Sequence, residues 1–171
     1  DVETFRPRDK GVLTDPRPIM MYVGRVAIEK NIEAFLSLPR EGTKYVVGGG
    51  PQLEHLKKKY PDVRFPGPKY GEELATYYAA ADVFVFPSLT DTFGLVMLES
   101  LASGVPVAAY PVAGPIDVIT SDTVGALDED LGRAIDTALP LSPEACREFA
   151  LAYSWDNVAK LFVSYLAPMT T

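Results

Sequence analysis

The sequence has little cysteine and histidine and no long apolar run. Among its 171 residues there is one cysteine, Cys146, and one histidine, His55. A single cysteine excludes a disulfide framework and a cysteine zinc cluster, and it favours a reducing, cytoplasmic location. No run reaches the roughly 18 to 20 apolar residues of a membrane-spanning helix. His55 lies among Glu54 and three lysines, which indicates an exposed helix and not a catalytic histidine.

Positive charge is also in short supply. The chain carries 16 Lys and Arg against 23 Asp and Glu, for a net charge of -7. Binding along a phosphate backbone needs a basic face, so nucleic acid is not expected as a partner. Any smaller anionic ligand must be bound by a local cluster of basic side chains or backbone amides.

The most informative stretch is residues 82–106. Residues 83–86 form an apolar run that predicts a buried strand, and a polar loop follows at 88–92. Residues 95–102 have only two polar members and predict a helix with little solvent face. A second apolar run at 107–109 then completes a strand, loop, helix and strand. This order predicts the βαβ unit of a parallel sheet.

The same alternation extends through the chain. Further strands are predicted at residues 19–23, 45–47, 63–65 and 126–127, and further helices at 29–38, 52–60, 72–80, 129–139, 143–153 and 155–167. The pattern indicates an α/β fold of Rossmann-like type, a doubly wound parallel sheet that binds ligands at the carboxyl ends of its strands. Residues 1–18 carry three prolines and no apolar period, and we interpret them as a linker or tail.

Two basic residues follow the first predicted strand. Gly24 and Arg25 lie in the loop after it, and Lys30 opens the next helix. Backbone N–H groups and the helix dipole favour anions at such a corner. The pair therefore predicts a diphosphate clamp, with two solvated surface cations as the alternative.

Glycines follow the second strand. Gly48 and Gly50 permit positive φ and a close approach of the backbone, but Leu53 stands where a dinucleotide fingerprint needs its third glycine. We therefore favour a tight strand-to-helix turn over an NAD site. Pro66 and Gly67 form the corresponding loop after the third strand.

Two acids mark the central unit, Asp91 in the loop and Glu99 in the helix. On a helix Glu99 lies beside Leu95 and Ala102, on the apolar side. A carboxylate there needs a partner, so one interpretation is a structural pair with a Lys, an Arg or a backbone amide. Residues 82–106 contain no Asp-x-Asp pair of the kind that binds a metal.

The combination of Asp91, Phe93, Gly94 and Glu99 resembles the acidic signature of the retaining glycosyltransferases with two Rossmann-like domains, the GT-B architecture, in group 1 or family 4 (mannosyltransferase-like). The stretch GRVAIEKN at residues 24–31 resembles a second motif of that family. There the first acid is usually Glu and contacts the transferred sugar, whereas here it is Asp91, one methylene shorter. The second acid binds the donor's ribose, and the Arg and Lys bind its pyrophosphate.

The resemblance implies a set of site residues. The catalytic set would be Arg25, Lys30 and Asp91. The positions that would bind the nucleotide-sugar donor are Gly24, Gly48, Gly50, Pro66, Gly67, Thr92, Phe93, Gly94, Leu95, Val96 and Glu99. No metal and no cofactor is implied, because the donor is a substrate.

The resemblance covers only the donor-binding half of the family's two-domain enzyme. Residues 19–171 would be that domain, with a terminal helix, and an N-terminal domain upstream of residue 1 would hold the acceptor. The expected partners are a UDP- or GDP-sugar and a lipid or glycan acceptor at the membrane surface, to which the full-length protein could be peripheral. The isolated chain is expected to be inactive in transfer. The alternatives are a sugar-nucleotide epimerase of the same fold and a non-catalytic nucleotide-binding module.

Overall fold

Six parallel strands form the centre of the protein. The computed structural model describes residues 1–91 and 94–153, and its sheet has the order β3-β2-β1-β4-β5-β6. The strands are β1 (Ile19–Val23), β2 (Thr43–Val47), β3 (Arg64–Gly67), β4 (Val83–Phe86), β5 (Val107–Ala109) and β6 (Gly125–Leu127). All neighbouring pairs are parallel. The predicted Rossmann-like α/β sheet is confirmed.

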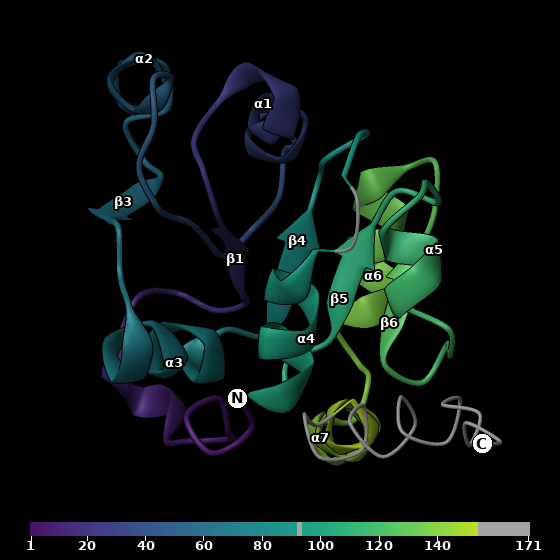
Figure 1. Ribbon diagram of the computed structural model, residues 1–171. Helices are drawn as coiled ribbons and strands as arrows, with labels where there is room; N and C mark the ends of the chain where they lie inside the picture. The colour runs from purple at the N-terminus through teal and green to yellow at the C-terminus, as the bar shows by residue number, and fades with distance from the viewer. Residues whose placement is uncertain (92–93, 154–171) are drawn as a thin grey trace, which may run out of the picture.

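Helices cover both faces of this sheet (Figure 1). One face packs against α3 (Gly71–Ala80), α4 (Leu95–Ala102), α5 (Pro115–Val118) and α7 (Pro143–Ala152). The other packs against α1 (Ile32–Leu36), α2 (Leu53–Lys59) and α6 (Leu131–Ala138). Side chains alternate along each strand, so Met21 and Phe84 enter the first core, whereas Met20 and Val85 enter the second. Strands buried on both faces explain why the sequence showed unbroken apolar runs.

The strand order places a topological switch point between β1 and β4. The chain builds outward from β1 to β2 and β3, then returns to the other side of β1 for β4, β5 and β6. The loops that leave β1 and β4 at their carboxyl ends therefore run to opposite sides, and such folds bind ligands in the crevice between them. Arg25, Lys30 and Asp91 were predicted to lie along the carboxyl edge of the sheet, and the strand order places the loops that carry them at this switch point.

The predicted helix 29–38 is wrong in its first part. A 3-10 turn, η2 (Ile28–Lys30), is followed by Asn31 in the left-handed conformation, and α1 starts only at Ile32. One residue of opposite handedness interrupts helical hydrogen bonding and changes the direction of the chain. The short α5 and the 3-10 turn η1 (Lys10–Val12) were not predicted. The predicted helix 155–167 lies outside the described residues.

Residues 1–18 pack against the domain. The Phe5 side chain is buried in the core on the α3 and α4 face. The Arg17 guanidinium donates to both Asp82 carboxylate oxygens, at 2.8 and 2.7 Å, and Lys10 Nζ lies 3.1 Å from Asp82. Figure 1 shows this N-terminal segment, in purple, running beside α3. The segment was predicted to be a linker or tail; in the structure it is anchored by the buried Phe5 side chain and by polar contacts, a combination that produces no apolar period in the sequence.

Replacing the anchoring acid, Asp82→Asn, is expected to lower the free energy of unfolding by about 1–2 kcal/mol at pH 7, since its cationic partners are more than a third exposed. Burial acts to raise the pKa of the Asp82 carboxyl, but hydrogen bonds from the Ile19 amide, Lys10 and Arg17 outweigh it, and the pKa lies below its ordinary 3.8. The stabilisation is therefore present above pH 3.8 and disappears as the pH falls through the lowered value.

Urea denaturation at pH 7 and at pH 2 measures this effect. The difference between wild type and variant should shrink at the lower pH. Asp62→Asn, on an exposed turn, is the matched control and should show no comparable loss at either pH. A loss for Asp82→Asn of the same size at both pH values would show that the carboxylate charge does not anchor the segment.

Candidate functional site

Two loops and a strand end meet at the carboxyl edge of the sheet. The Gly24 amide donates to the Val47 carbonyl at 3.0 Å, and the Gly48 amide donates to the Gly67 carbonyl at 3.0 Å. The Val26 amide donates to the Gly49 carbonyl at 2.9 Å. These bonds join the loops after β1 and β2 and the end of β3 into one surface. Three predicted site residues, Gly24, Gly48 and Gly67, therefore lie on a single edge.

The glycines after β2 allow this close packing of backbone on backbone. Gly48 has a φ of 148°, and a Cβ atom there would lie 1.9 Å from the Gly24 carbonyl oxygen. Gly50 has a φ of 158°, and its Cβ would lie 2.3 Å from the Val26 carbonyl oxygen. Any larger residue would force the first two loops apart. The close approach that the sequence predicted is thus between two loops of the chain itself.

Lys30 and Asp91 form an ion pair across the switch point. Lys30 Nζ lies 2.6 Å from Asp91 Oδ2, although the two residues are 61 positions apart. Both side chains are mostly buried, with exposed fractions of 24% and 18%. The structure therefore brings together two of the three predicted catalytic residues, one from the loop after β1 and one from the loop after β4.

Arg25 is arranged differently. Its side chain is 67% exposed, and its guanidinium lies 3.5 Å from Glu29, one turn along the chain. The backbone beneath it is fixed, because the hydroxyl of buried Tyr22 donates to the Arg25 carbonyl at 2.9 Å. Burial, together with the charges of Asp91 and Glu29, raises the pKa of Tyr22, so its hydroxyl keeps its proton and remains a donor. Arg25 thus has a rigid base and a side chain that extends into solvent beside the Lys30 corner.

Glu99 is half-buried on α4. Its carboxylate accepts a hydrogen bond from the Tyr78 hydroxyl at 3.2 Å. Burial raises the pKa of Glu99 above its ordinary 4.5, and the Tyr78 hydrogen bond offsets part of that rise. Among the residues the structure describes, Glu99 forms no ion pair. The described residues therefore do not show Glu99 paired with a Lys, an Arg or a backbone amide, as one interpretation of the sequence expected.

The first turn of α4 follows Asp91 closely. Gly94 precedes the helix with a φ of 66°, where a Cβ would lie 2.7 Å from the Met97 methyl. Leu95 is exposed and Val96 is half-buried at the start of this helix. The predicted site residues Thr92 and Phe93 lie outside the described residues.

The end of β3 lies at the far end of the same edge. Pro66 and Gly67 were predicted to form a loop after the third strand, which is wrong: β3 extends to Gly67, because its backbone pairs with the end of β2. Both residues are half-buried, and Gly67 has a φ of 80° with no other atom within 4 Å of where a Cβ would lie. The Gly67 carbonyl accepts a hydrogen bond from the Gly48 amide, which connects this strand end to the loop after β2.

A cavity of about 310 Å³ lies on the α1 and α2 side of this corner. It is lined by Ala27, Ile28, Asn31, Ile32, Glu33, Gln52 and Leu56, none of which was predicted as a site residue. Asn31 also contacts the β4 end, through a hydrogen bond from its amide to the Pro87 carbonyl at 3.1 Å. One feature of the sequence could have pointed to Asn31. Asparagine adopts the left-handed conformation more readily than most residues, and this one directly follows the lysine of the predicted clamp.

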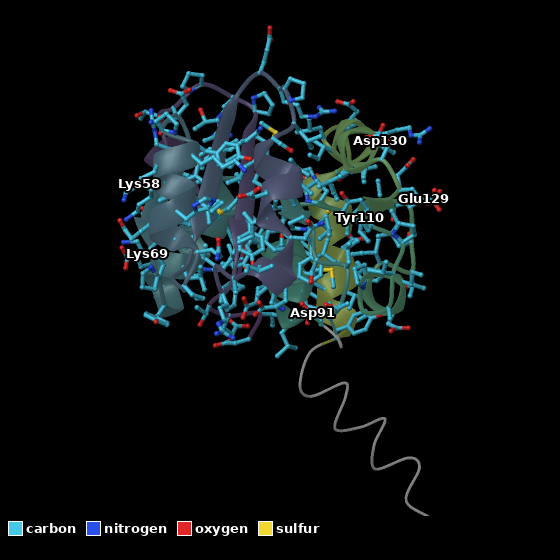
Figure 2. The ribbon with its side chains drawn as sticks, turned by 90° about the horizontal axis from the view of Figure 1, so that it is seen from above. Lys58, Lys69, Asp91, Tyr110, Glu129 and Asp130 are labelled. Carbon is cyan, nitrogen blue, oxygen red and sulfur yellow. The ribbon has the colours of Figure 1, made fainter. Side chains whose placement is uncertain are left out.

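The remaining acids do not form a metal centre. Within residues 1–91 and 94–153, no three His, Cys, Asp or Glu side chains gather closely enough to hold a metal ion. The run of acids at residues 128–130 is used locally, since Asp130 caps α6 and Asp128 binds Arg133. Figure 2 shows Glu129 and Asp130 on the α6 side, away from Asp91. In the described part of the chain no helix is long and apolar enough to cross a membrane.

The strand order and the position of this site are those of a Rossmann-like α/β ligand-binding domain. A sequence profile described as "Glycosyl transferases group 1" matches residues 17–139. The chain belongs to this family, which confirms the resemblance found in the sequence.

The relatives are named glycosyltransferases. A GDP-mannose-dependent alpha-mannosyltransferase from Mycobacterium tuberculosis is 38% identical over 135 residues, which cover 74% of this chain and 36% of that protein. The sulfoquinovosyl transferase SQD2 from Arabidopsis thaliana is 37% identical over 139 residues, covering 73% of this chain and 27% of that protein. The chain thus spans about a third of the length of these relatives.

Solved structures share the fold. Sucrose-phosphate synthase from Thermosynechococcus elongatus has a TM-score of 0.77 at 28% identity, over 96% of this chain and 49% of that one. Anabaena HepE, solved in complex with UDP-glucose, has a TM-score of 0.72 at 19% identity, over 97% and 56%. Such neighbours are GT-B glycosyltransferases, so the predicted architecture is confirmed, while the individual site residues stay predictions.

Proposed function

We propose that this chain is the donor-binding domain of a retaining glycosyltransferase and binds a nucleoside diphosphate sugar. The observation that carries the proposal is the Lys30–Asp91 pair, 2.6 Å apart at the switch point. A cation for the diphosphate and an acid for sugar hydroxyls lie there side by side. One relative is named as GDP-mannose-dependent, and one structural neighbour was solved with UDP-glucose, which supports a UDP- or GDP-sugar as the donor.

The proposed chemistry follows from where charge develops. Departure of the leaving group builds negative charge on the diphosphate, and fixed positive groups stabilise that transition state. Lys30, Arg25 and the amides at the start of α4 supply this stabilisation, and Asp91 accepts hydrogen bonds from the sugar. Glu99 accepts from the ribose. The acceptor would be held by a part of the protein beyond these residues, so the isolated chain is expected not to transfer sugar at a useful rate.

The acceptor class rests on weaker support. One relative, at 35% identity over 153 residues, is named alpha-monoglucosyldiacylglycerol synthase, from Streptococcus pneumoniae. That name favours a lipid acceptor and a protein peripheral to the membrane. Neither an epimerase nor a non-catalytic nucleotide-binding module is favoured by any relative's name given above.

Binding of UDP or GDP to this chain is expected to be unchanged by a chelator. The positive groups of the proposed site are side chains and amides, and the affinity should fall as salt is raised, because a charge-assisted clamp is screened. Isothermal titration calorimetry with and without EDTA, at two salt concentrations, measures both effects. Loss of binding in EDTA would show that a metal completes the site. Absence of binding under every condition would overturn the proposed function.

A further inference from the structure

Asn31 has an unusual backbone conformation for its residue type. Its φ of 51° and ψ of 33° make it the one non-glycine residue with positive φ in the part of the chain that the structure describes. This conformation costs free energy for residues with a side chain and persists where surrounding contacts hold it. Asparagine tolerates it better than most residues do. Contacts of the Asn31 side chain should therefore explain why the turn is maintained.

The side chain makes a long-range contact and not a local one. Asparagine at the start of a helix ordinarily caps that helix with its side-chain oxygen, but Asn31 makes no such bond to α1. Its amide Nδ2 instead donates to the Pro87 carbonyl at 3.1 Å, 56 positions away. Pro87 directly follows β4, and the loop that begins there contains Asp91. The bond therefore joins the corner after β1 to the loop after β4.

Two adjacent residues thus contact one loop at two points. Asn31 binds Pro87 at its start, and Lys30 binds Asp91 four residues further along, at 2.6 Å. The left-handed turn at Asn31 separates η2 from α1, so Lys30 belongs to a tight turn and not to a regular helix. The orientation of the Lys30 side chain across the switch point depends on that turn.

We propose that Asn31 is a positioning residue of the donor site. Its left-handed backbone and its amide bond to Pro87 hold the Lys30 corner against the Asp91 loop, which sets the Lys30 ammonium where a diphosphate binds. The identity of the ligand in this proposal rests on the proposed function. The geometry around Asn31 rests on the structure alone. Asn31 itself contacts no reacting atom in this assignment.

Substitutions at Asn31 distinguish the contribution of its side-chain amide from that of its left-handed backbone. Asn31→Gly keeps the left-handed turn and removes the amide, so the affinity for UDP and GDP should fall about three- to tenfold, the effect of one neutral hydrogen bond. Asn31→Asp keeps the shape but turns an acceptor toward the Pro87 carbonyl, and it should lower affinity at least as much. Asn31→Ala loses both the amide and the tolerance of positive φ, so its melting temperature should drop furthest of the three.

A double-mutant cycle with Lys30→Gln tests whether Asn31 acts through Lys30. If it does, Asn31→Gly in the Lys30→Gln background should change the UDP and GDP dissociation constants less than twofold, because the group it positions is gone. A merely structural role would give the same three- to tenfold loss in both backgrounds. That result would overturn the proposal, as would unchanged affinity in Asn31→Gly alone.

A crystal structure of Asn31→Gly tests the geometry without a nucleotide. The Lys30 Nζ to Asp91 Oδ2 distance is expected to exceed 4 Å, against 2.6 Å in the wild type. An unchanged ion pair would overturn the positioning role whatever the protein binds. If the wild-type chain binds neither UDP nor GDP, the proposed function fails, and this distance still decides the inference about Asn31.

Discussion

Glu99→Gln is expected to weaken binding of UDP and GDP about 10- to 150-fold while leaving the melting temperature of the unliganded protein unchanged or slightly raised. The affinity loss is that of one hydrogen bond to a charged acceptor, about 1.5–3 kcal/mol. The stability result follows from the surroundings of Glu99. Its described hydrogen-bond partner is the neutral Tyr78 hydroxyl, which can donate equally to the amide oxygen of the variant, so the substitution breaks no described hydrogen-bonded ion pair.

The pH dependence of stability tests independently whether the Glu99 carboxylate destabilises the unliganded protein. Burial raises the pKa of this carboxyl in the folded state above its ordinary 4.5. A raised pKa favours folding below pH 4.5, and this contribution is lost as the pH rises through the folded value. The charged carboxylate is therefore a cost at neutral pH, which the amide removes. The variant's gain in stability over wild type should be larger at pH 7 than at pH 4.

Matched variants separate the two roles of the α4 acid. Glu148→Gln removes an exposed acid from α7 and should change neither affinity nor stability. Tyr78→Phe removes the hydroxyl that contacts Glu99 and should raise the pKa of Glu99 further, since that hydrogen bond favours the charged form. Thermal melts and titrations with both nucleotides provide the comparison. A melting drop for Glu99→Gln with unchanged affinity would identify Glu99 as a core residue.

The sheet could be predicted because most of its strands are buried on both faces. Apolar runs such as residues 83–86 are local signals, and short loops between alternating elements leave few alternatives to a parallel sheet. The partly exposed β3 gives a weaker signal, and its predicted bounds, 63–65, fall short of Arg64–Gly67. Because loops at the carboxyl ends of parallel strands meet at one edge, Lys30 and Asp91 could be assigned to that edge. The strand order, which makes β1 and β4 neighbours, was not predictable in this way.

The details that failed depend on single tertiary contacts. The break between η2 and α1 comes from one left-handed residue, Asn31. Its hydrogen bond to Pro87 is a long-range contact, which a prediction from helix propensity does not include. The partner of Glu99 is a tyrosine on another helix, which a search for nearby cations could not find. The packing of residues 1–18 depends on one buried aromatic side chain, Phe5, and on polar pairs such as Arg17 with Asp82, and neither leaves a periodic pattern.

The largest change in ligand binding beside Glu99 is expected at Lys30. Lys30→Gln should weaken UDP and GDP about 10- to 150-fold, because a charge-assisted hydrogen bond to the diphosphate is lost. It should weaken UDP-glucose and GDP-mannose equally, since the diphosphate is common to all four. Lys58→Gln is the matched control: Figure 2 shows Lys58, on α2, at the left edge of the view and well away from Asp91 at its lower side. A similar loss in both variants would indicate general attraction by charge and not a clamp.

Asp91→Asn should have a different signature. In the unliganded protein Asp91 holds the Lys30 ammonium at 2.6 Å, and removing its charge frees that ammonium for the diphosphate. Affinity for bare UDP or GDP should therefore be unchanged or improved, whereas UDP-glucose or GDP-mannose should lose the carboxylate that accepts from the sugar. The ratio of nucleotide-sugar to nucleotide affinity should fall about tenfold or more, the effect of a hydrogen bond to a charged group. If instead both ligands weaken by the same factor, Asp91 serves to orient Lys30 and does not contact the sugar.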